Sequence, residues 1–240
     1  ITITDTPPEF LEFFSSMIAM DDPRHARLRR IVSKGFTPRM LAALEDSVQE
    51  IASGIVDTIT ERGECDFVTD VAAALPLKIV CDLMGVPDSA YNQVFKNTNI
   101  ILGVGDPEFA PDNVDFVTAL LNAGAELAEL MREVAANKKG GNGTDLTSVL
   151  VNAEIEGDHL DEADLASFFV LLVVAGNETT RNAISWGLKY LTDNPDQRSI
   201  WMDDYEGIAP SAVDEIIRLA SPVTYMRRTV TQDTSLAGRE

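Results

Sequence analysis

Apolar residues recur along most of the chain at helical spacing, and short polar stretches divide them into segments. Several divisions carry a helix-start signal, such as Thr37 followed by Pro38, in which a capping side chain precedes a proline suited to a first turn. The connections resemble loops rather than domain linkers. We therefore predict one mainly α-helical domain over residues 1–240, with helices at about 22–34, 37–62, 66–84, 88–100, 112–137, 145–153, 161–194, 199–204 and 209–219.

Two local features qualify this helical pattern. Pro76 lies within the segment 66–84, where it predicts a kink because proline lacks a backbone N–H. Residues 228–231 and 234–236 instead alternate like short strands, with a hairpin turn at 232–233. We expect a helical core with a small partial β-sheet.

The segment 161–194 carries the clearest chemical signal. Residues 165–174 are apolar on every side, as in a buried helix, and then Gly176, Glu178 and Thr179 arrive together. The Thr179 hydroxyl can bond the carbonyl of Ala175 one turn back, and Gly176 leaves space beside the helix; both effects loosen or bend a helix. The pattern predicts a polar notch in a buried helix, with a proton donor beside it.

Charge and cysteine content narrow the function classes. With 19 Lys and Arg against 39 Asp and Glu, the net charge of −20 argues against binding nucleic acid or an anionic membrane surface. The apolar stretch 165–176 is shorter than the roughly 20 residues that span a bilayer. Cys65 and Cys81 are too few for a disulfide framework and lack zinc spacing, which favours a cytoplasmic location. His159 lies in a polar turn without a metal-ligand partner, so we expect it to be exposed.

The ends of the chain do not look like natural termini. Ile1 is not an initiator methionine, and the residues after it lack the basic and apolar regions of a signal peptide. At the other end a strand-like stretch with Gly238 leads to Glu240, where the chain stops without a closing element. We expect these residues to be a segment of a longer protein.

The first predicted helix places basic groups on an apolar face. His25 and Arg29 fall at i and i+4, and Leu28 and Val32 fall at i+3 and i+7 on the same face. Such groups suit a buried carboxylate or phosphate, because both give charge-assisted hydrogen bonds to anionic oxygens. On this feature alone, however, a solvated basic helix with an ordinary histidine is favoured.

The same helix and its exit also form a local positive patch. Six of the nineteen basic residues lie there, including Arg24, Arg27 and Arg30. Against an acidic background, such a patch can orient an acidic protein partner. A solvated charged face explains it equally well.

Glu215 and Arg218 lie at i and i+3 on a later predicted helix. As a surface pair they would contribute about 0.2–0.5 kcal/mol. Because Ile216, Ile217 and Leu219 make much of that helix apolar, the pair could instead be buried. The spacing is common and leaves both readings open, and Arg228 further along carries no signal by itself.

In this order, the motifs resemble those of the cytochrome P-450 family, the haem-thiolate monooxygenases, over nearly the whole chain. Residues 21–30 and 35–38 look like the family's helix that holds the haem propionates, and residues 76–87 resemble a stretch typical of its bacterial members. Residues 175–180 match the oxygen-activation motif, and Glu215 with Arg218 match the Glu-x-x-Arg pair. Each motif alone is weak, but four in sequence are a specific signal.

This resemblance implies an incomplete cytochrome P-450 fold with haem b, iron protoporphyrin IX, as the cofactor. A set of residues on three segments would contact the haem: His25, Arg29, Ala175, Gly176, Thr179 and Arg228. Glu215 and Arg218 would be a structural pair. The arginines at 24, 27 and 30 would help to dock a ferredoxin-type electron donor.

The implied activity is insertion of one oxygen atom from dioxygen into a C–H bond of an apolar substrate, with electrons from NAD(P)H through that ferredoxin. Thr179 and Glu178 would be the catalytic alcohol and acid, with Glu178 relaying protons as a general acid. The pocket would be lined by Leu171, Ala175, Val223 and Thr224. Residues 174–182 are similar to those of actinobacterial members that act on sterols or branched lipids.

One part of the family pattern has no counterpart in these residues. The family's haem-ligand loop carries a cysteine, and Cys65 and Cys81 lie in the wrong places to replace it. Because the thiolate favours O–O cleavage, we expect the segment alone to be inactive and the whole protein to be the enzyme. The alternative is a non-catalytic helical ligand-binding or interaction module, with the polar notch as a small-molecule site.

Overall fold

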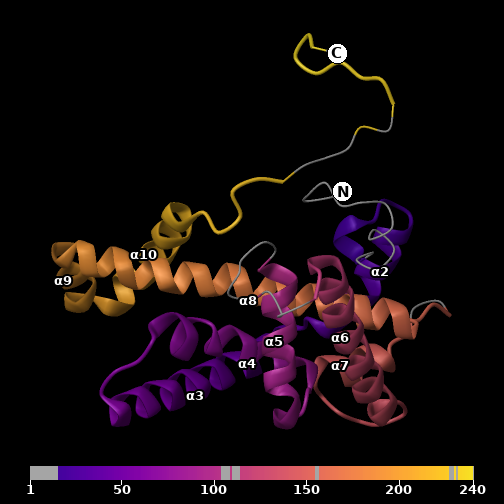
Figure 1. Cartoon of the computed structure of the whole chain (residues 1–240), viewed down its shortest axis with the longest axis horizontal. Helices are drawn as coiled ribbons and strands as arrows, with labels where there is room; N and C mark the ends of the chain where they lie inside the picture. The colour runs from indigo at the N-terminus through magenta and orange to yellow at the C-terminus, as the bar shows by residue number, and fades with distance from the viewer. Residues whose placement is uncertain are drawn as a thin grey trace.

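A 32-residue helix, α8 (Glu162–Asp193), runs through the middle of the molecule and contacts α4, α5, α6, α9 and α10 (Figure 1). The structure is a computed structural model that describes residues 16–103, 109, 114–154, 157–226, 230 and 232–239. Asp161 caps α8 because its carboxylate accepts the backbone N–H of Asp164 at 2.7 Å. The predicted long helix is therefore confirmed.

The other helices follow the predicted segments along most of the described chain, so the mainly α-helical fold is confirmed. The α-helices are α2 (Arg24–Val32), α3 (Pro38–Arg62), α4 (Ala74–Met84), α5 (Tyr91–Leu102), α6 (Phe116–Lys138), α7 (Leu146–Val151), α9 (Pro195–Asp203) and α10 (Tyr205–Ala220). The shorter elements are the 3₁₀ turns η1 (Met17–Ala19), η2 (Ser33–Gly35) and η4 (Asp88–Ala90) and the π-helical segment η3 (Val68–Ala72).

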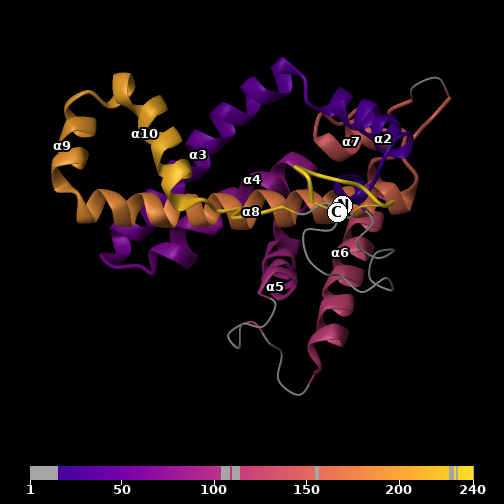
Figure 2. The ribbon, with the colours of Figure 1, turned by 90° about the horizontal axis from the view of Figure 1, so that it is seen from above.

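The core forms where α4, α5, α6 and α7 pack against the N-terminal half of α8. Figure 2 shows α5 and α6 projecting from one side of α8 and α3 from the other. Burial of each large apolar side chain contributes about 1.5–3 kcal/mol. The most deeply buried ones are Leu77, Met84, Val94, Leu127, Met131, Leu146, Leu150, Phe169 and Val173.

Two predictions about local structure are wrong. The segment 66–84 is not one kinked helix, because η3 precedes α4 and Pro76 lies in the first turn of α4, where a backbone N–H is not needed. Residues 234–236 do not form a strand: Leu236 makes only an isolated bridge to Arg239 across a turn at 237–238. The other strand candidate, 228–231, lies outside the described residues except for Val230, which has no regular structure.

By length and composition alone, α8 is apolar enough to cross a membrane. In this fold it is the central helix of a bundle, with other helices packed along most of its length. It also carries Asp164, Glu178 and Arg181 among its turns. The apolar residues of α8 are therefore explained by its packing against other helices of the core.

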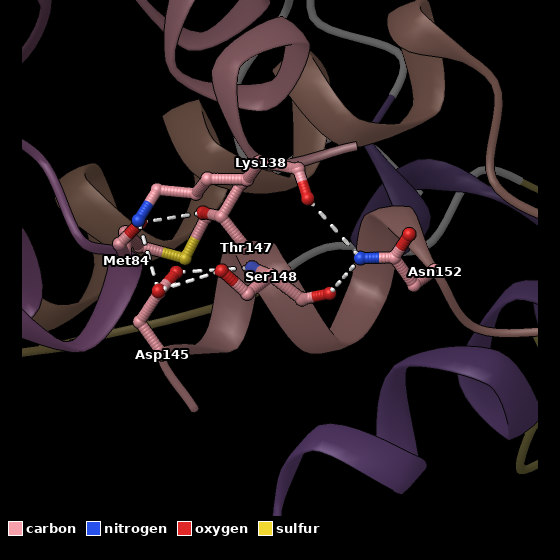
Figure 3. A network of polar contacts seen from close by, with 6 residues as sticks. All are labelled: Met84, Lys138, Asp145, Thr147, Ser148 and Asn152. Atoms are coloured by element: carbon pink, nitrogen blue, oxygen red, sulfur yellow. Dashed lines mark hydrogen bonds and ion pairs between the residues drawn. The ribbon is translucent and has the colours of Figure 1, made fainter. Parts of the chain in front are cut away.

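A polar junction joins the ends of α4 and α6 to the start of α7 (Figure 3). The Lys138 ammonium donates to the Asp145 carboxylate at 2.8 Å, and Asp145 also caps α7 by accepting the N–H of Ser148 at 3.0 Å. The buried Thr147 hydroxyl donates to the carbonyl of Met84 at 2.6 Å. Burial raises the pKa of Asp145, but the hydrogen bonds from Lys138 and Ser148 outweigh it and hold that pKa below its ordinary value. Asp145 is therefore an ionised anchor where three helices meet.

Gly85 ends α4 beside this junction and provides a test of it. Its φ is +64°, and a Cβ there would lie 2.4 Å from Lys138 Nζ and 2.7 Å from Asp145 Cγ. Gly63 ends α3 at a similar φ of +78°, but nothing lies within 4 Å of its Cβ position. We predict that Gly85→Ala lowers the free energy of unfolding of the intact protein by about 2–3 kcal/mol, against about 1 kcal/mol for Gly63→Ala. Urea denaturation would measure both free energies. Equal losses of stability would contradict the prediction, because they would show that Lys138 and Asp145 move aside without cost.

Candidate functional site

The predicted notch is a stripe along one face of α8. Leu171, Ala175 and Thr179 lie one turn apart, with Ala175 exposed and the other two half-buried. The Thr179 hydroxyl donates to the carbonyl of Ala175 at 2.7 Å, as the sequence predicted. The helix continues unbroken to Asp193, so the predicted interruption is a change in surface chemistry rather than a break in the backbone.

Gly176 has a packing role that the sequence did not reveal. A Cβ at this position would lie 3.3 Å from Cγ2 of Val80 on α4. A glycine here therefore lets α8 and α4 approach closely, next to the stripe. The contact with a cofactor expected for Gly176 stays a prediction.

Glu178 is held by a polar network that reaches another helix. Its carboxylate pairs with Arg181 and also accepts a hydrogen bond from the Asn182 amide at 3.1 Å. Arg181 in turn donates to the side-chain oxygen of Asn99 on α5 at 3.2 Å. Only 14% of the Arg181 side chain and 27% of the Glu178 side chain are exposed. The network fixes where the carboxylate lies and ties it to α5.

The acid and the alcohol are neighbours that bond in opposite directions along the helix. The Thr179 hydroxyl bonds the turn before it, at Ala175. The Glu178 carboxylate bonds the turn after it, at Arg181 and Asn182. The two side chains therefore make no hydrogen bond to each other, and each can contact a further group independently. Their predicted catalytic roles remain predictions.

Asn177 directly precedes these two residues and lies on the buried side of α8. It is 0% exposed, and neither its amide nitrogen nor its amide oxygen has a hydrogen-bond partner among the described residues. An unpaired buried polar group costs about 1–3 kcal/mol. The segment that carries Glu178 and Thr179 therefore also contains a residue whose burial lowers the stability of the fold.

Helix α2 carries the two residues predicted to bind an anion. Its buried residues are Leu28, Ile31 and Val32, whereas Arg29 is exposed and His25 is only half-buried. The His25 ring nitrogen Nδ1 lies 3.7 Å from the Asp22 carboxylate. These exposures agree with the solvated basic helix that the sequence favoured on this feature alone, and the binding of haem carboxylates by His25 and Arg29 stays a prediction.

The arginines predicted to dock an electron donor have partners within the chain. Arg24 and Arg27 both approach Asp164 at the start of α8, and Arg27 also approaches Asp158 at 3.7 Å. A hollow of about 820 Å³ lies at this place. Its lining mixes both charges and consists of Pro23, Arg24, Ala26, Arg27, Arg30, Asp158, Asp161 and Asp164.

Glu215 and Arg218 form the surface pair and not the buried one. Both oxygens of the Glu215 carboxylate accept from the Arg218 guanidinium at 2.7 Å, while 54% and 67% of the two side chains are exposed. The hydrogen bond from Arg218 holds the pKa of Glu215 below its ordinary value. Helix α10 packs on α8 near Gly187, where a Cβ would lie 3.2 Å from Ile216. The structural role of this pair stays a prediction.

The remaining predicted site residues follow α10 along the chain. Val223 and Thr224 follow α10 and are exposed, and Arg228 lies outside the described residues. Since Gly187 is twelve residues beyond Ala175, α10 meets α8 about 18 Å further along its axis. Where the chain is described, no group of three or more His, Cys, Asp or Glu side chains is arranged to hold a metal ion. Burial raises the pKa of the Cys81 thiol to about 12, so it stays protonated.

Comparison with known proteins places these features in context. No protein-family model matches the chain. It is 48% identical over 241 residues to the methyl-branched lipid omega-hydroxylase of Mycobacterium tuberculosis, covering 99% of this chain and 55% of that protein. It is 38% identical over 223 residues to the steroid C26-monooxygenase of the same organism, covering 92% of this chain and 49% of that protein. The chain spans about half the length of the curated relatives it matches.

Solved structures agree with these relatives. Cytochrome P450 CYP268A2 of Mycobacterium marinum, in complex with pseudoionone, superposes with a TM-score of 0.82 at 40% identity, covering 89% of this chain and 52% of that one. Substrate-free CYP109E1 of Bacillus megaterium gives a TM-score of 0.85 at 29% identity, covering 99% and 62%. The helical arrangement around α8 is therefore one that these proteins share.

The Arg181 network yields a stability prediction with a matched control. Glu129 and Arg132 on α6 form an ion pair at the same i, i+3 spacing, but both side chains are well exposed. We predict that Arg181→Leu lowers the free energy of unfolding of the intact protein by about 2 kcal/mol, because it leaves Glu178 and Asn99 without their partner. Arg132→Leu should cost below about 0.5 kcal/mol. Urea denaturation compares the two, and similar small losses would show that the Arg181 network is only a surface pair.

Proposed function

Since the chain belongs to the cytochrome P450 family and spans about half the length of its relatives, we propose that the whole protein is a haem-dependent monooxygenase that hydroxylates an apolar substrate. The observation that carries this proposal is the stripe on α8. Its small and hydroxyl-bearing residues lie beside an anchored carboxylate, within a fold shared with cytochrome P450s.

The described residues fit a flat apolar group with acidic substituents. Ala175 presents only a methyl group on the exposed side of α8, between Leu171 and Thr179, so a planar ring system can approach this face closely. His25 and Arg29 lie on one side of α2, where they would bind the carboxylates of haem b. When bound, the haem supplies the oxygen-activating redox chemistry, and the protein binds and orients the reactants.

Thr179 and Glu178 would handle protons at this face. The Thr179 hydroxyl donates its hydrogen bond to the carbonyl of Ala175. Its oxygen therefore stays free to accept a hydrogen bond from a water molecule at the stripe. Glu178 is partly exposed and hydrogen-bonded, so it can exchange protons with solvent and pass them toward that water as a general acid. Arg181 and Asn182 set the position from which it does so.

The substrate class follows from the relatives. Those named for methyl-branched lipids and steroids support an apolar lipid or sterol-like substrate, held against Leu171 and Ala175 and, further along, Val223 and Thr224. A ferredoxin-type donor would relay electrons from NAD(P)H in the cytoplasm. On α2 it would meet the exposed arginines at 24, 27 and 30, of which Arg24 and Arg27 also approach Asp164 within the chain.

A spectrum of the whole protein tests the cofactor. We expect the purified, reduced protein to show the shifted Soret band of a thiolate-ligated haem when carbon monoxide is added, because the thiolate pushes electron density onto the iron. The dithionite-reduced protein without carbon monoxide is the reference. A whole protein that gives no such band would contradict the proposed function.

A substitution tests the alcohol. We predict that Thr179→Ala in the whole protein leaves NAD(P)H consumption largely intact but reduces product formed per NAD(P)H by about tenfold, because the acceptor that holds water at the stripe is lost. Thr180→Ala is the matched control, since Thr180 is the next residue but is exposed on another face of α8. Product yield measured by mass spectrometry against NAD(P)H absorbance decides the matter. Equal yields in the two variants would remove Thr179 from this role.

A further inference from the structure

An ion-pair clamp joins α2 to the start of α8, and we define it as Arg24, Arg27 and Asp164. Arg24 Nη2 lies 3.4 Å from one carboxylate oxygen of Asp164, and Arg27 Nη2 lies 4.0 Å from the other. Only 5% of the Asp164 side chain is exposed, against 60% and 44% of the two arginine side chains. A buried carboxylate on one helix is therefore held by two guanidinium groups from another.

The burial of Asp164 makes this clamp different from a surface pair. An exposed ion pair is weak because water and salt screen it. Removing one partner of a buried charge leaves that charge uncompensated, which is much more costly. Asp164 therefore strongly favours the orientation of α2 that keeps the guanidinium groups beside it.

The position of the clamp on α2 controls how that helix is rotated. Successive residues of an α-helix are about 100° apart around the axis. On this basis the buried residues Leu28, Ile31 and Val32 form one stripe, with Arg27 beyond its Ile31 side and Arg24 within that side, one turn before Leu28. The opposite edge is formed by His25 and Arg29. Holding the Ile31 side against α8 therefore fixes the direction in which the opposite edge points.

Helix α2 needs such a device because its own packing is limited. It has nine residues and three that are buried, so a modest rotation about its axis would keep most of its apolar contact. The same rotation would swing the long side chains at 25 and 29 by several ångströms, since they extend far from the axis. Apolar packing alone does not specify their direction.

We propose that Asp164 is a positioning residue: through Arg24 and Arg27 it fixes the rotation of α2 and so aims His25 and Arg29 at the carboxylate groups of the haem. This inference rests on the proposed function. Asp164 itself does not bind the haem, because its carboxylate faces the two arginines. Its effect on haem retention passes through residues on another helix.

The test measures haem release from the whole, haem-loaded protein into excess apomyoglobin. Arg24→Gln breaks the clamp at an exposed side chain, which avoids loss of folding, and Asp164→Asn breaks it at the buried one. Arg62→Gln is the matched control, because Arg62 is also a half-exposed arginine in an ion pair, with Asp70 at 3.1 Å, but it lies at the end of α3. We expect about tenfold faster haem release for Arg24→Gln and no change for Arg62→Gln, as for other partners that orient a ligand-holding side chain.

A second comparison separates positioning from general destabilisation. If the clamp acts through His25 and Arg29, then Arg24→Gln should no longer accelerate haem release in a protein that already carries His25→Ala and Arg29→Ala. A purely structural role would instead give the same acceleration in both backgrounds, and that result would overturn the proposal. Equal haem release from Arg24→Gln and Arg62→Gln would also overturn it while leaving the proposed function intact. A whole protein that binds no haem would overturn the proposed function and the inference together.

Discussion

The structure depends on one helix, α8, which packs into the core on one side and carries the proposed reactive stripe on the other. One face of α8 is buried in the helical bundle and carries Phe169, Val173 and Asn177. Ala175 and Thr179 lie on its more exposed face. Because the two faces belong to one rigid helix, rotating it to move Thr179 would pull Phe169 out of the core. Burial of a side chain of that size is worth about 1.5–3 kcal/mol, so the core fixes the direction of the reactive stripe.

Charge placement follows a second constraint, since the chain carries far more acids than bases. Several of its arginines and lysines lie beside acids that are buried or partly buried: Lys138 beside Asp145, Arg181 beside Glu178, and Arg24 with Arg27 beside Asp164. Each of these pairs lies where helices meet. The pairs at 129 and 132 and at 215 and 218 are exposed and join residues of a single helix. Ion pairs therefore contribute to the architecture according to their depth and to the number of helices they join.

What the sequence could predict is what local spacing determines. The long helix from 161 to about 194 and the hydrogen bond from Thr179 to Ala175 both depend on residues within four positions of each other, and the structure confirms them. Two later helices begin earlier than predicted, at Pro195 and Tyr205 rather than at 199 and 209. The link from Arg181 to Asn99 spans 82 positions, and that from Arg24 to Asp164 spans 140. No periodicity encodes such pairs. The spacing of Glu178 to Arg181 and Asn182 was visible in the sequence and could have been noticed as an i, i+3, i+4 set.

The failed predictions have the same origin. Alternation at 234–236 suggested a strand, but a strand needs a partner, and the described residues offer Leu236 only a bridge three residues away at Arg239. On α2, apolar spacing placed His25 and Arg29 beside apolar residues but could not determine which side of the helix is held against the rest of the chain. The long-range clamp at Asp164 shows which side of the helix is held.

Asn177 shows how closely the core and the site compete within α8. Asn177 is as fully buried as Val173 one turn earlier, a position that an apolar side chain would suit. The chain instead places there an amide whose nitrogen and oxygen both lack a hydrogen-bond partner among the described residues. Local rules of core composition are most often broken where a segment has another role. The residues on either side of it, at 175–176 and 178–179, are those that contact α4, bond the preceding turn and hold the anchored carboxylate. The unfavourable burial of Asn177 therefore belongs to the same short segment as the proposed chemistry, and the well-packed first half of α8 is what allows the helix to remain continuous through it.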